Sequence, residues 1–385
     1  MRLCGQSVKV EMDRFFKSLM EHPEQAEAIS KSAFTQARKK LKHEAFIALA
    51  DHQRNFYYER APYQKSWLGH RLVAVDGSTA VLPKSDDLVK KFGYLDPSAQ
   101  SKTVMANIST AYDVMNQLVI DAQIEPYGTS EHDMLLDHAH RLSKGDIAVM
   151  DRGYGSAWVM GMLLERKVDF CIRLSRSWKD AARLMEQGPS DIDWCPPTEK
   201  SHKKMADQRP TSPIIQPLRL VCIDVEPGKR VVLATSLTDR AKYPVERISE
   251  LYHLRWQVEE SYKTLKHVLE LEHFSGKSEL AVKQDFYARV FVANMASMVS
   301  SQLAHEGINQ RNAKPRKHGV QLNRLQALAK LRDCMVALLN LCNLTAILVG
   351  LRRQLLSCLE CIRPNRKVPR PKMVKPRKYQ GYKGI

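Results

Sequence analysis

The stretch GDIAVMDRGYGSAWVMGMLLERKVDFCIRLSR, residues 145–176, contains three segments of alternating type. Four consecutive apolar residues, 147–150, are typical of a short buried strand, and this run ends at Asp151. Glycines lead from there into an apolar segment, 156–168, that is long enough for a helix. The next segment, 169–176, predicts a further strand. Such alternation favours a sheet that is covered by helices.

Three more strands are predicted on the N-terminal side. RLVAVDGSTAVLP, 71–83, is apolar and β-branched, and we expect it to turn at Asp76-Gly77. VMANISTAYDVMNQLVIDAQIEPYG, 104–128, supplies two strands around the turn DVMN. A meander followed by alternating helices and strands predicts an α/β fold with a mixed sheet flanked by helices.

The remaining segments divide the chain into regions. The predicted regions are a helical region (1–70), a first α/β region (71–175), a β-strand insertion (176–243), a helix (244–275), a second helical region (276–362) and a basic tail (363–385). Arg38, Lys39, Lys40 and Lys42 crowd the exposed side of a predicted N-terminal helix, and we expect them to contact DNA as surface cations. A solvated basic helix within a bundle is the alternative.

The charge of the chain points to a polyanionic partner. Sixty Lys and Arg residues against 42 Asp and Glu residues give a net charge of +18 over 385 residues. The longest apolar run, 334–351, is interrupted by Asn and Thr, so it predicts a buried core helix rather than a membrane span. The N-terminal residues contain no apolar signal region, and we expect a cytoplasmic protein associated with the nucleoid.

One polar group occupies a single side of a predicted helix in LYHLRWQVEESYKTLKHVLEL, 251–271. At about 100° per residue, Tyr252, Arg255, Glu259 and Lys266 fall within a sector of about 60° that borders the apolar stripe. This arrangement can place a carboxylate at the lip of a cleft beside a phenol and two cations. An i,i+4 ion pair between Arg255 and Glu259 on the surface is the simpler interpretation.

Two aspartates at strand ends can join that carboxylate. Asp76 and Asp151 follow predicted strands, and such residues meet at one edge of a sheet. With Glu259 they form a set of hard oxygen ligands that suits Mg²⁺ or Mn²⁺ rather than Zn²⁺. Two such ions, about 3.5–4 Å apart, activate a hydroxyl for attack on a phosphodiester. Each aspartate taken alone is equally well explained as a turn residue.

The spacing Tyr252-x2-Arg255-x3-Glu259-x6-Lys266 resembles the YREK signature of the DDE transposases of bacterial insertion sequences, in the insertion-sequence-four family. LVAVDGS resembles the first-aspartate strand of that family, and DRGYGS resembles its second-aspartate block. The resemblance implies an RNase H-like catalytic core, whose first part is 71–175, with a β-strand insertion before the last catalytic helix in 244–275. In such a layout, 1–70 would bind the DNA ends and 276–362 would serve dimerisation or core packing. It also implies that Asp76, Asp151 and Glu259 hold two Mg²⁺ or Mn²⁺ ions.

The resemblance further implies cut-and-paste transposition through a DNA hairpin intermediate. The partners would be double-stranded DNA, as terminal inverted repeats and target, and a second copy of the chain in a homodimer, with no membrane. Tyr252, Arg255, Lys266 and Arg173 would bind phosphates, and Trp194 is a candidate for stacking on a flipped base. Two alternatives stay open: a structure-selective RNase H-like nuclease, and a catalytically silent DNA-binding regulator.

Overall fold

The computed structural model describes residues 8–19, 30–95, 103–197, 214, 216–226, 228–303, 318–323, 326–331, 334 and 344–361. The predicted basic tail, 363–385, lies outside the described residues. In chain order the structure contains α1 (Val8–Leu19), α2 (Lys31–Lys40), α3 (Glu44–Arg60), β1 (Leu72–Val81), α4 (Asp86–Phe92), β2 (Met105–Asp113), β3 (Leu118–Pro126), α5 (Glu131–His138), η2 (Ala139–Arg141), β4 (Ile147–Met150), η3 (Arg152–Tyr154), α6 (Ala157–Glu165), β5 (Asp169–Leu174), α7 (Lys179–Gln187), β6 (Ser190–Trp194), β7 (Leu218–Glu226), β8 (Lys229–Thr235), α8 (Val245–Leu254), α9 (Trp256–Lys263), the π-helical turn η5 (Thr264–Val268), α10 (Glu279–Leu303), β9 (Val320–Leu322), α13 (Leu344–Leu356) and β10 (Leu359–Cys361).

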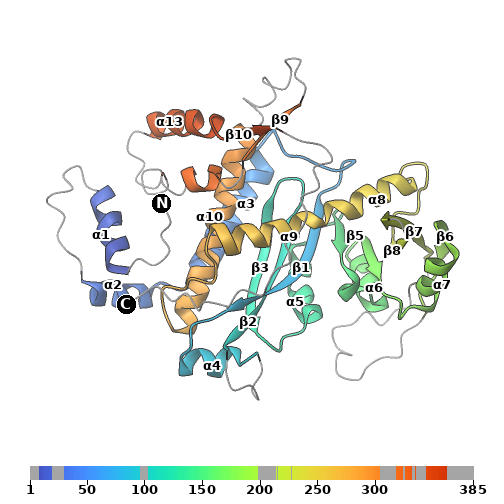
Figure 1. Ribbon diagram of the computed structural model, residues 1–385, viewed down its shortest axis with the longest axis horizontal. Coiled ribbons are helices and arrows are strands. Elements are labelled where there is room, and N and C mark those ends of the chain that lie inside the picture. Colours follow the sequence, from blue (N-terminus) through green and yellow to red (C-terminus); the bar gives the residue numbers. More distant parts are fainter. Residues whose placement is uncertain are drawn as a thin grey trace.

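An eight-stranded mixed sheet in the order β3-β2-β1-β4-β5-β8-β7-β6 forms the centre of the molecule (Figure 1). β1 pairs antiparallel with β2 and parallel with β4, and β4 pairs parallel with β5. This meander followed by parallel strands confirms the predicted α/β, RNase H-like fold. β6, β7 and β8 come from the predicted insertion, 176–243, and extend the same sheet beyond β5. The limits of the predicted regions stay a prediction.

The prediction that the chain turns at Asp76-Gly77 is wrong. β1 runs unbroken through both residues, with Asp76 opposite Thr110 and Gly77 opposite Ser109 of β2. Asp and Gly are common in turns, but here the apolar residues on both sides keep the strand in the ladder. Asp76 therefore lies inside a strand, where its backbone is held by the neighbouring strands.

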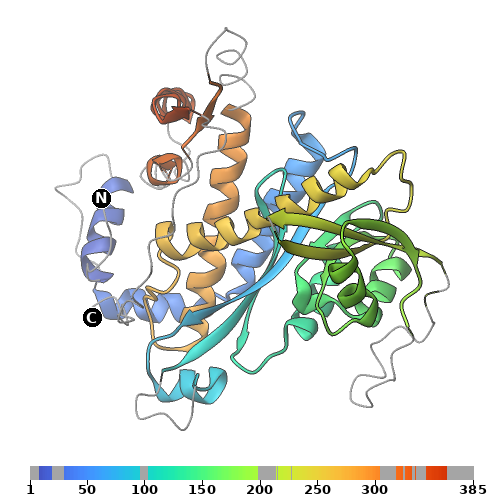
Figure 2. The ribbon, with the colours of Figure 1, turned by 45° about the vertical axis from the view of Figure 1, so that its right-hand side comes forward.

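Helices cover both faces of the sheet and enclose two hydrophobic cores, as the two views of the ribbon show (Figures 1 and 2). On one face, α4, α8, α9 and α10 bury apolar side chains against alternate residues of the strands, such as Leu72 and Ala74 of β1. On the other face, α5, α6 and α7 pack on the residues between them, such as Val73 and Val75. The period-two alternation of β1 thus serves both cores.

The helices at the two ends of the chain pack beside this sandwich. α3 is anchored to the β2–β3 hairpin, where Arg54 Nη1 donates to the Ile120 carbonyl at 2.5 Å and Tyr58 Oη donates to Asp113 at 2.5 Å. Leu351 and Leu355 of α13 pack in a small third core that also contains Ala296 of α10. Among the described helices, none combines the length and the hydropathy that a membrane crossing requires.

The predicted buried helix over 334–351 is only partly found. Its described residues are Cys334, which packs against the third core, and 344–351, which belong to α13; there Leu344, Leu348 and Val349 are 38%, 44% and 55% exposed. Only one side of α13 contacts the third core, so an apolar sequence does not mean burial on all sides here.

Candidate active site

The sheet register brings the two predicted aspartates to one level. Val75 of β1 is paired with Met150 of β4, and the two strands are parallel. Asp76 and Asp151, one residue further along each strand, therefore lie side by side. Asp151 ends β4 and caps η3, and its Oδ1 accepts a hydrogen bond from the Gly153 N–H at 2.6 Å. This is the edge at which a carboxylate pair was predicted.

Helix α9 carries Glu259 to the same edge and is fixed there by a buried tyrosine. Tyr262, which is 5% exposed, donates its hydroxyl to the carbonyl oxygen of Asp76 at 2.6 Å. Further along, Lys266 Nζ donates to Ser78 Oγ at 2.8 Å and to the Thr79 carbonyl at 2.6 Å. The segment that follows Glu259, from α9 into η5, is therefore held along β1.

Arg255 lies between two of the predicted carboxylates. Its Nη2 is 2.7 Å from Glu259 Oε1, and its Nη1 is 3.6 Å from Asp76 Oδ2. The guanidinium also lies over the ring of Tyr252, at 5.8 Å from the ring centre, and the side chain is 11% exposed. α8 ends at Leu254 and α9 begins at Trp256, so Arg255 occupies the joint between the two helices. The i,i+4 pair exists, but it is part of a partly buried cluster.

Asp151 and Glu259 are close enough to Asp76 for their charges to raise the pKa of Asp76. Burial raises the pKa of Asp76 to about 6, Arg255 and the Gly77 N–H oppose this rise, and the negative charges of Asp151 and Glu259 add to it. The pKa of Glu131 is also raised, by burial first and then by Asp151. Asp76 thus responds to both of the other predicted catalytic groups.

Glu131 belongs to this edge, although the sequence pattern does not single it out. It is the first residue of α5, and Ser130 is the N-cap of that helix. An acidic residue in the first turn of a helix is common, because it interacts favourably with the helix dipole. The sequence alone therefore gives no reason to assign Glu131 to the site, because an acidic residue at the start of a capped helix has this ordinary explanation.

The donor set fits a hard divalent cation. The three predicted ligands are all carboxylates, the negative charges of Asp151 and Glu259 act on Asp76, and oxygen ligands are those that Mg²⁺ and Mn²⁺ prefer. Beside the aspartates, Gly77 and Gly153 leave room for side-chain carboxylate oxygens at places where a Cβ would approach them to 2.6–3.2 Å. Within the described ranges, no three His, Cys, Asp or Glu side chains are grouped closely enough to hold a metal ion, and Glu259 is turned toward Arg255.

Arg173 lies in the same row of the sheet. Ile172 of β5 is paired with Met150 of the parallel strand β4. The next residue of each strand, Arg173 and Asp151, therefore lie side by side, at the level of Asp76 in β1. Its Nε is buried and has no hydrogen-bond partner among the described residues. The positive charge of Arg173 also reaches Tyr252, where it counteracts the rise in pKa that burial causes. The predicted cation is thus placed beside the carboxylates.

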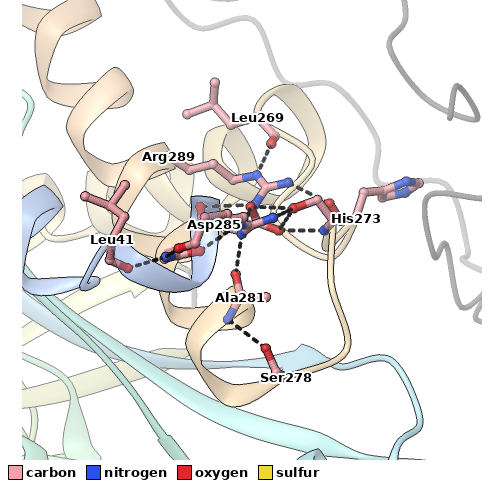
Figure 3. A network of polar contacts seen from close by, with 10 residues as sticks. Leu41, Leu269, His273, Ser278, Ala281, Asp285 and Arg289 are labelled. Atoms are coloured by element: carbon pink, nitrogen blue, oxygen red, sulfur yellow. Dashed lines mark hydrogen bonds and ion pairs between the residues drawn. The ribbon is translucent and has the colours of Figure 1, made fainter. Parts of the chain in front are cut away.

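The four N-terminal cations do not share one environment. Arg38 is directed into the protein, where it forms an ion pair with Asp285 of α10 at 2.9 Å and donates to the Ala281 carbonyl at 2.9 Å. Figure 3 shows Asp285 and Ala281 within this polar network, which joins α2 to α10. The prediction that Arg38 is a surface cation is therefore wrong, because its charge is already neutralised. Lys39, Lys40 and Lys42 are exposed.

Trp194 lies in the second core. It is 6% exposed, its ring meets that of Trp178 edge-to-face at 5.5 Å between centroids, and its Nε1 donates to Asp180 Oδ2 at 2.9 Å. A tryptophan so enclosed has no open face for a base. The structure therefore gives no support to the predicted stacking role of Trp194.

Comparison with known proteins agrees with this geometry. Residues 67–295 match the family described as transposase DDE domain, and they contain all three predicted carboxylates. The transposase InsG for insertion sequence element IS4 of Escherichia coli (strain K12) is 22% identical over 283 residues, which are 69% of this chain and 60% of that protein. The chain thus spans less than two thirds of that relative.

A solved structure of the piggyBac transposase synaptic complex with hairpin DNA overlaps with a TM-score of 0.44 and 11% identity, covering 94% of this chain and 70% of that one. The family match is the stronger finding, because it includes more than half of the chain and every catalytic candidate. It also confirms the resemblance drawn from the Tyr252, Arg255, Glu259 and Lys266 spacing. The chain belongs to the family of transposase DDE domains.

Proposed function

We propose that this chain is a DNA transposase that cuts DNA and joins the cut end to a target by metal-dependent hydrolysis and strand transfer. One observation carries the proposal: Asp76 and Asp151 follow paired residues of parallel strands, and Tyr262 ties the helix of Glu259 to Asp76. Three carboxylates from distant segments thus share one edge of the sheet. The family match supports the same activity.

In this proposal, Asp76, Asp151 and Glu259 hold two Mg²⁺ or Mn²⁺ ions. Bound there, the ions would activate the attacking oxygen and stabilise the leaving oxygen of a phosphodiester. To bind an ion, Glu259 has to release Arg255, because Arg255 Nη2 lies 2.7 Å from Glu259 Oε1. A DNA phosphate is the natural new partner for the released guanidinium.

Arg173, Tyr252 and Arg255 are proposed to bind phosphates beside the carboxylates. Arg173 has a buried Nε that lacks a partner among the described residues, and an anion would supply one. Lys266 now binds Ser78 and the Thr79 carbonyl, so a role in holding β1 accompanies its proposed phosphate contact.

The finer steps of the proposal follow the family expectation. They are cut-and-paste movement of an insertion sequence, a hairpin intermediate, recognition of terminal inverted repeats and pairing of two ends in a homodimer. Trp194 is not part of the proposal, because it is buried against Trp178. The predicted N-terminal DNA contact is kept for Lys39, Lys40 and Lys42, which are exposed.

The test is cleavage of DNA that carries the inverted repeats flanking the coding region, with Mg²⁺ or Mn²⁺. Asp76→Asn, Asp151→Asn and Glu259→Gln should each slow cleavage by about a thousandfold or more, since each removes about 4 kcal/mol of transition-state stabilisation. Glu165→Gln, on the exposed end of α6, is the matched control and should cut like the wild type. Undiminished cleavage by all three variants would refute the site.

The same assay separates the two alternatives. Specific binding of the repeats without metal-dependent cutting in the wild type would select a silent regulator. Cutting of junctions or RNA hybrids without any need for the repeats, and without joining, would select a structure-selective nuclease.

A further inference from the structure

A fourth carboxylate lies beside the two aspartates of the proposed site. An ideal Cβ on Gly77 would be 2.6 Å from Glu131 Oε1, and one on Gly153 would be 3.2 Å from Glu131 Oε2. The same Cβ on Gly153 would be 3.0 Å from Asp151 Oδ1. Gly77 directly follows Asp76 in β1, so the Glu131 carboxylate is next to both aspartate segments.

The start of α5 holds Glu131 in this position. Ser130 Oγ accepts a hydrogen bond from the Asp133 N–H at 3.1 Å and so caps the helix. Just before it, the Thr129 carbonyl accepts from Asn107 Nδ2 of β2 at 2.8 Å, which ties the turn to the sheet. Side chains in a helix tilt toward its N-terminus, so Glu131 is directed to the strand ends.

The two glycines are explained by the same contact. Each glycine lacks a side chain at the place where the Glu131 carboxylate approaches the backbone. The Cβ of an alanine at position 77 would displace that carboxylate. Neither glycine has a positive φ, so neither is required by backbone conformation. Close approach of a side chain is therefore the physical reason for glycine here.

No cation in the described part of the chain neutralises this carboxylate. Glu259 has Arg255 as a partner, whereas Glu131 makes no ion pair or hydrogen bond with a side chain among the described residues. Two carboxylates, those of Glu131 and Asp151, are thus held near each other without a shared positive charge. A divalent cation is the partner that relieves this repulsion.

We propose that Glu131 is a further carboxylate of the metal site, acting with Asp76 and Asp151 on the same ion. The inference rests on the proposed function, because it assigns Glu131 to the metal site of that function. Side-chain rotation is part of binding, since no three of the described acidic side chains are yet grouped around one point.

The test measures Mn²⁺ binding directly, by following the electron paramagnetic resonance signal of free Mn²⁺ during titration of the full chain without DNA. Glu131→Gln should weaken Mn²⁺ binding by about tenfold or more, because even the loss of a group that only orients a metal ligand costs about 10- to 100-fold in affinity. Asp137→Asn is the matched control, because Asp137 is an exposed acid on the same helix. The control should bind like the wild type.

Gly77→Ala provides a second variant that keeps every carboxylate. Its Cβ would lie 2.6 Å from Glu131 Oε1, so the flexible Glu131 side chain must move while β1 is retained. Weaker Mn²⁺ binding with an unchanged circular dichroism spectrum supports the inference. Titrations of Glu131→Gln and Gly77→Ala that superimpose on that of the wild type overturn it.

Asp76→Asn and Asp151→Asn separate this inference from the proposed function. If they lose Mn²⁺ binding while Glu131→Gln keeps it, the metal site stands and the role of Glu131 is wrong. If they bind Mn²⁺ as well as the wild type does, the metal site itself is wrongly placed, and the role of Glu131 fails with it.

Discussion

Tyr262 shows how one hydroxyl can connect a helix to a catalytic strand. Its hydrogen bond to the Asp76 carbonyl joins residues 186 positions apart, and Ser109 Oγ donates to the same carbonyl at 3.2 Å. Tyr262→Phe leaves the ring packed in the core and removes only the contact that aligns α9 with β1. We expect a loss of about 1 kcal/mol in unfolding free energy. We also expect cleavage to be slower by roughly 10- to 100-fold, because a misplaced Glu259 is costly.

Urea unfolding and single-turnover cleavage measure these two effects of Tyr262→Phe. Tyr154→Phe is the control, because Tyr154 is buried near the same edge and its hydroxyl has no partner among the described residues. Removing that hydroxyl should leave stability and cleavage nearly unchanged. Equal effects of both variants would show that Tyr262 acts only through packing.

The raised pKa of Asp76 predicts a stability that depends on pH. In the folded chain the pKa is about 6, above the ordinary value of 3.8, chiefly because Asp76 is buried. Between these two values the native state binds a proton that the unfolded chain lacks, so unfolding free energy falls as pH rises. The contribution is complete below pH 3.8 and is lost as pH rises through about 6.

Urea unfolding without metal at pH 5, 6, 7 and 8 tests this dependence on pH. The wild type should lose about 1.4 kcal/mol between pH 5 and pH 8 through Asp76, whereas Asp76→Asn should lack that component. Asp76→Asn should therefore be the more stable protein at pH 8. The attribution to Asp76 is wrong if both proteins lose stability in parallel.

Sequence patterns locate some of the site and not the rest. Asp151 and Glu259 follow from a position at a strand end and from a spaced signature, both of which are local properties of the chain. An expected turn singles out Asp76, but Asp76 lies inside β1. Tyr262 lies in the apolar stripe of its helix, so its hydroxyl looks incidental until β1 is beside it. Glu131 looks like an ordinary acidic residue in the first turn of a helix, and its nearness to the aspartates is seen only in the folded chain.

At the scale of elements, Arg219 joins three parts of the insertion. It is fully buried in β7, where it forms two hydrogen bonds with Asp191 of β6, at 2.6 and 2.7 Å. Its Nη1 also donates to the carbonyls of Leu237 and Tyr243, in the segment that leads into α8. Arg219 therefore sets where the insertion meets the catalytic helices.

Arg219→Met should lower the unfolding free energy by about 3–5 kcal/mol, because it leaves a partly buried Asp191 and two carbonyls without their donor. Arg247→Met is the control, since the ion pair of Arg247 with Glu250 is about half exposed on each side, at 51% and 48%. That pair should contribute at most about 1 kcal/mol. Chemical denaturation compares the two variants, and similar losses would contradict the role given to Arg219.

The packing of α2 against α10 explains why the prediction of Arg38 as a surface cation is wrong. Its neighbours Lys39 and Lys40 are exposed, and all three belong to one basic stretch of α2. The partners of Arg38 on α10 are about 240 residues away in sequence, so no local pattern distinguishes it from the lysines. A charge run predicts an exposed face on average, but the environment of each member depends on tertiary contacts.

At the scale of the molecule, the rhythm of strands and helices was predictable and their order in the sheet was not. Alternation and turn residues are properties of neighbouring residues, and they predicted the meander and the parallel strands correctly. β8 lies beside β5 because Ile172 pairs with Ala234, a contact that only the folded chain defines. The insertion therefore extends the sheet, although the sequence alone presents it as a separate block.

The net charge of +18 predicts that binding to duplex DNA depends steeply on salt. Each neutralised phosphate releases counterions, so a plot of log affinity against log salt should have a slope steeper than about −5.

Lys39→Ala combined with Lys40→Ala should make the slope shallower by about 0.9 for each phosphate that these lysines no longer neutralise. Lys144→Ala combined with Arg166→Ala removes the same charge from the opposite edge of the sheet, before β4 and β5, and should leave the slope unchanged. Fluorescence anisotropy at salt concentrations from about 50 to about 200 mM measures the DNA affinity of all three proteins. A nearly flat affinity in the wild type would mean that the positive charge of the chain serves another partner.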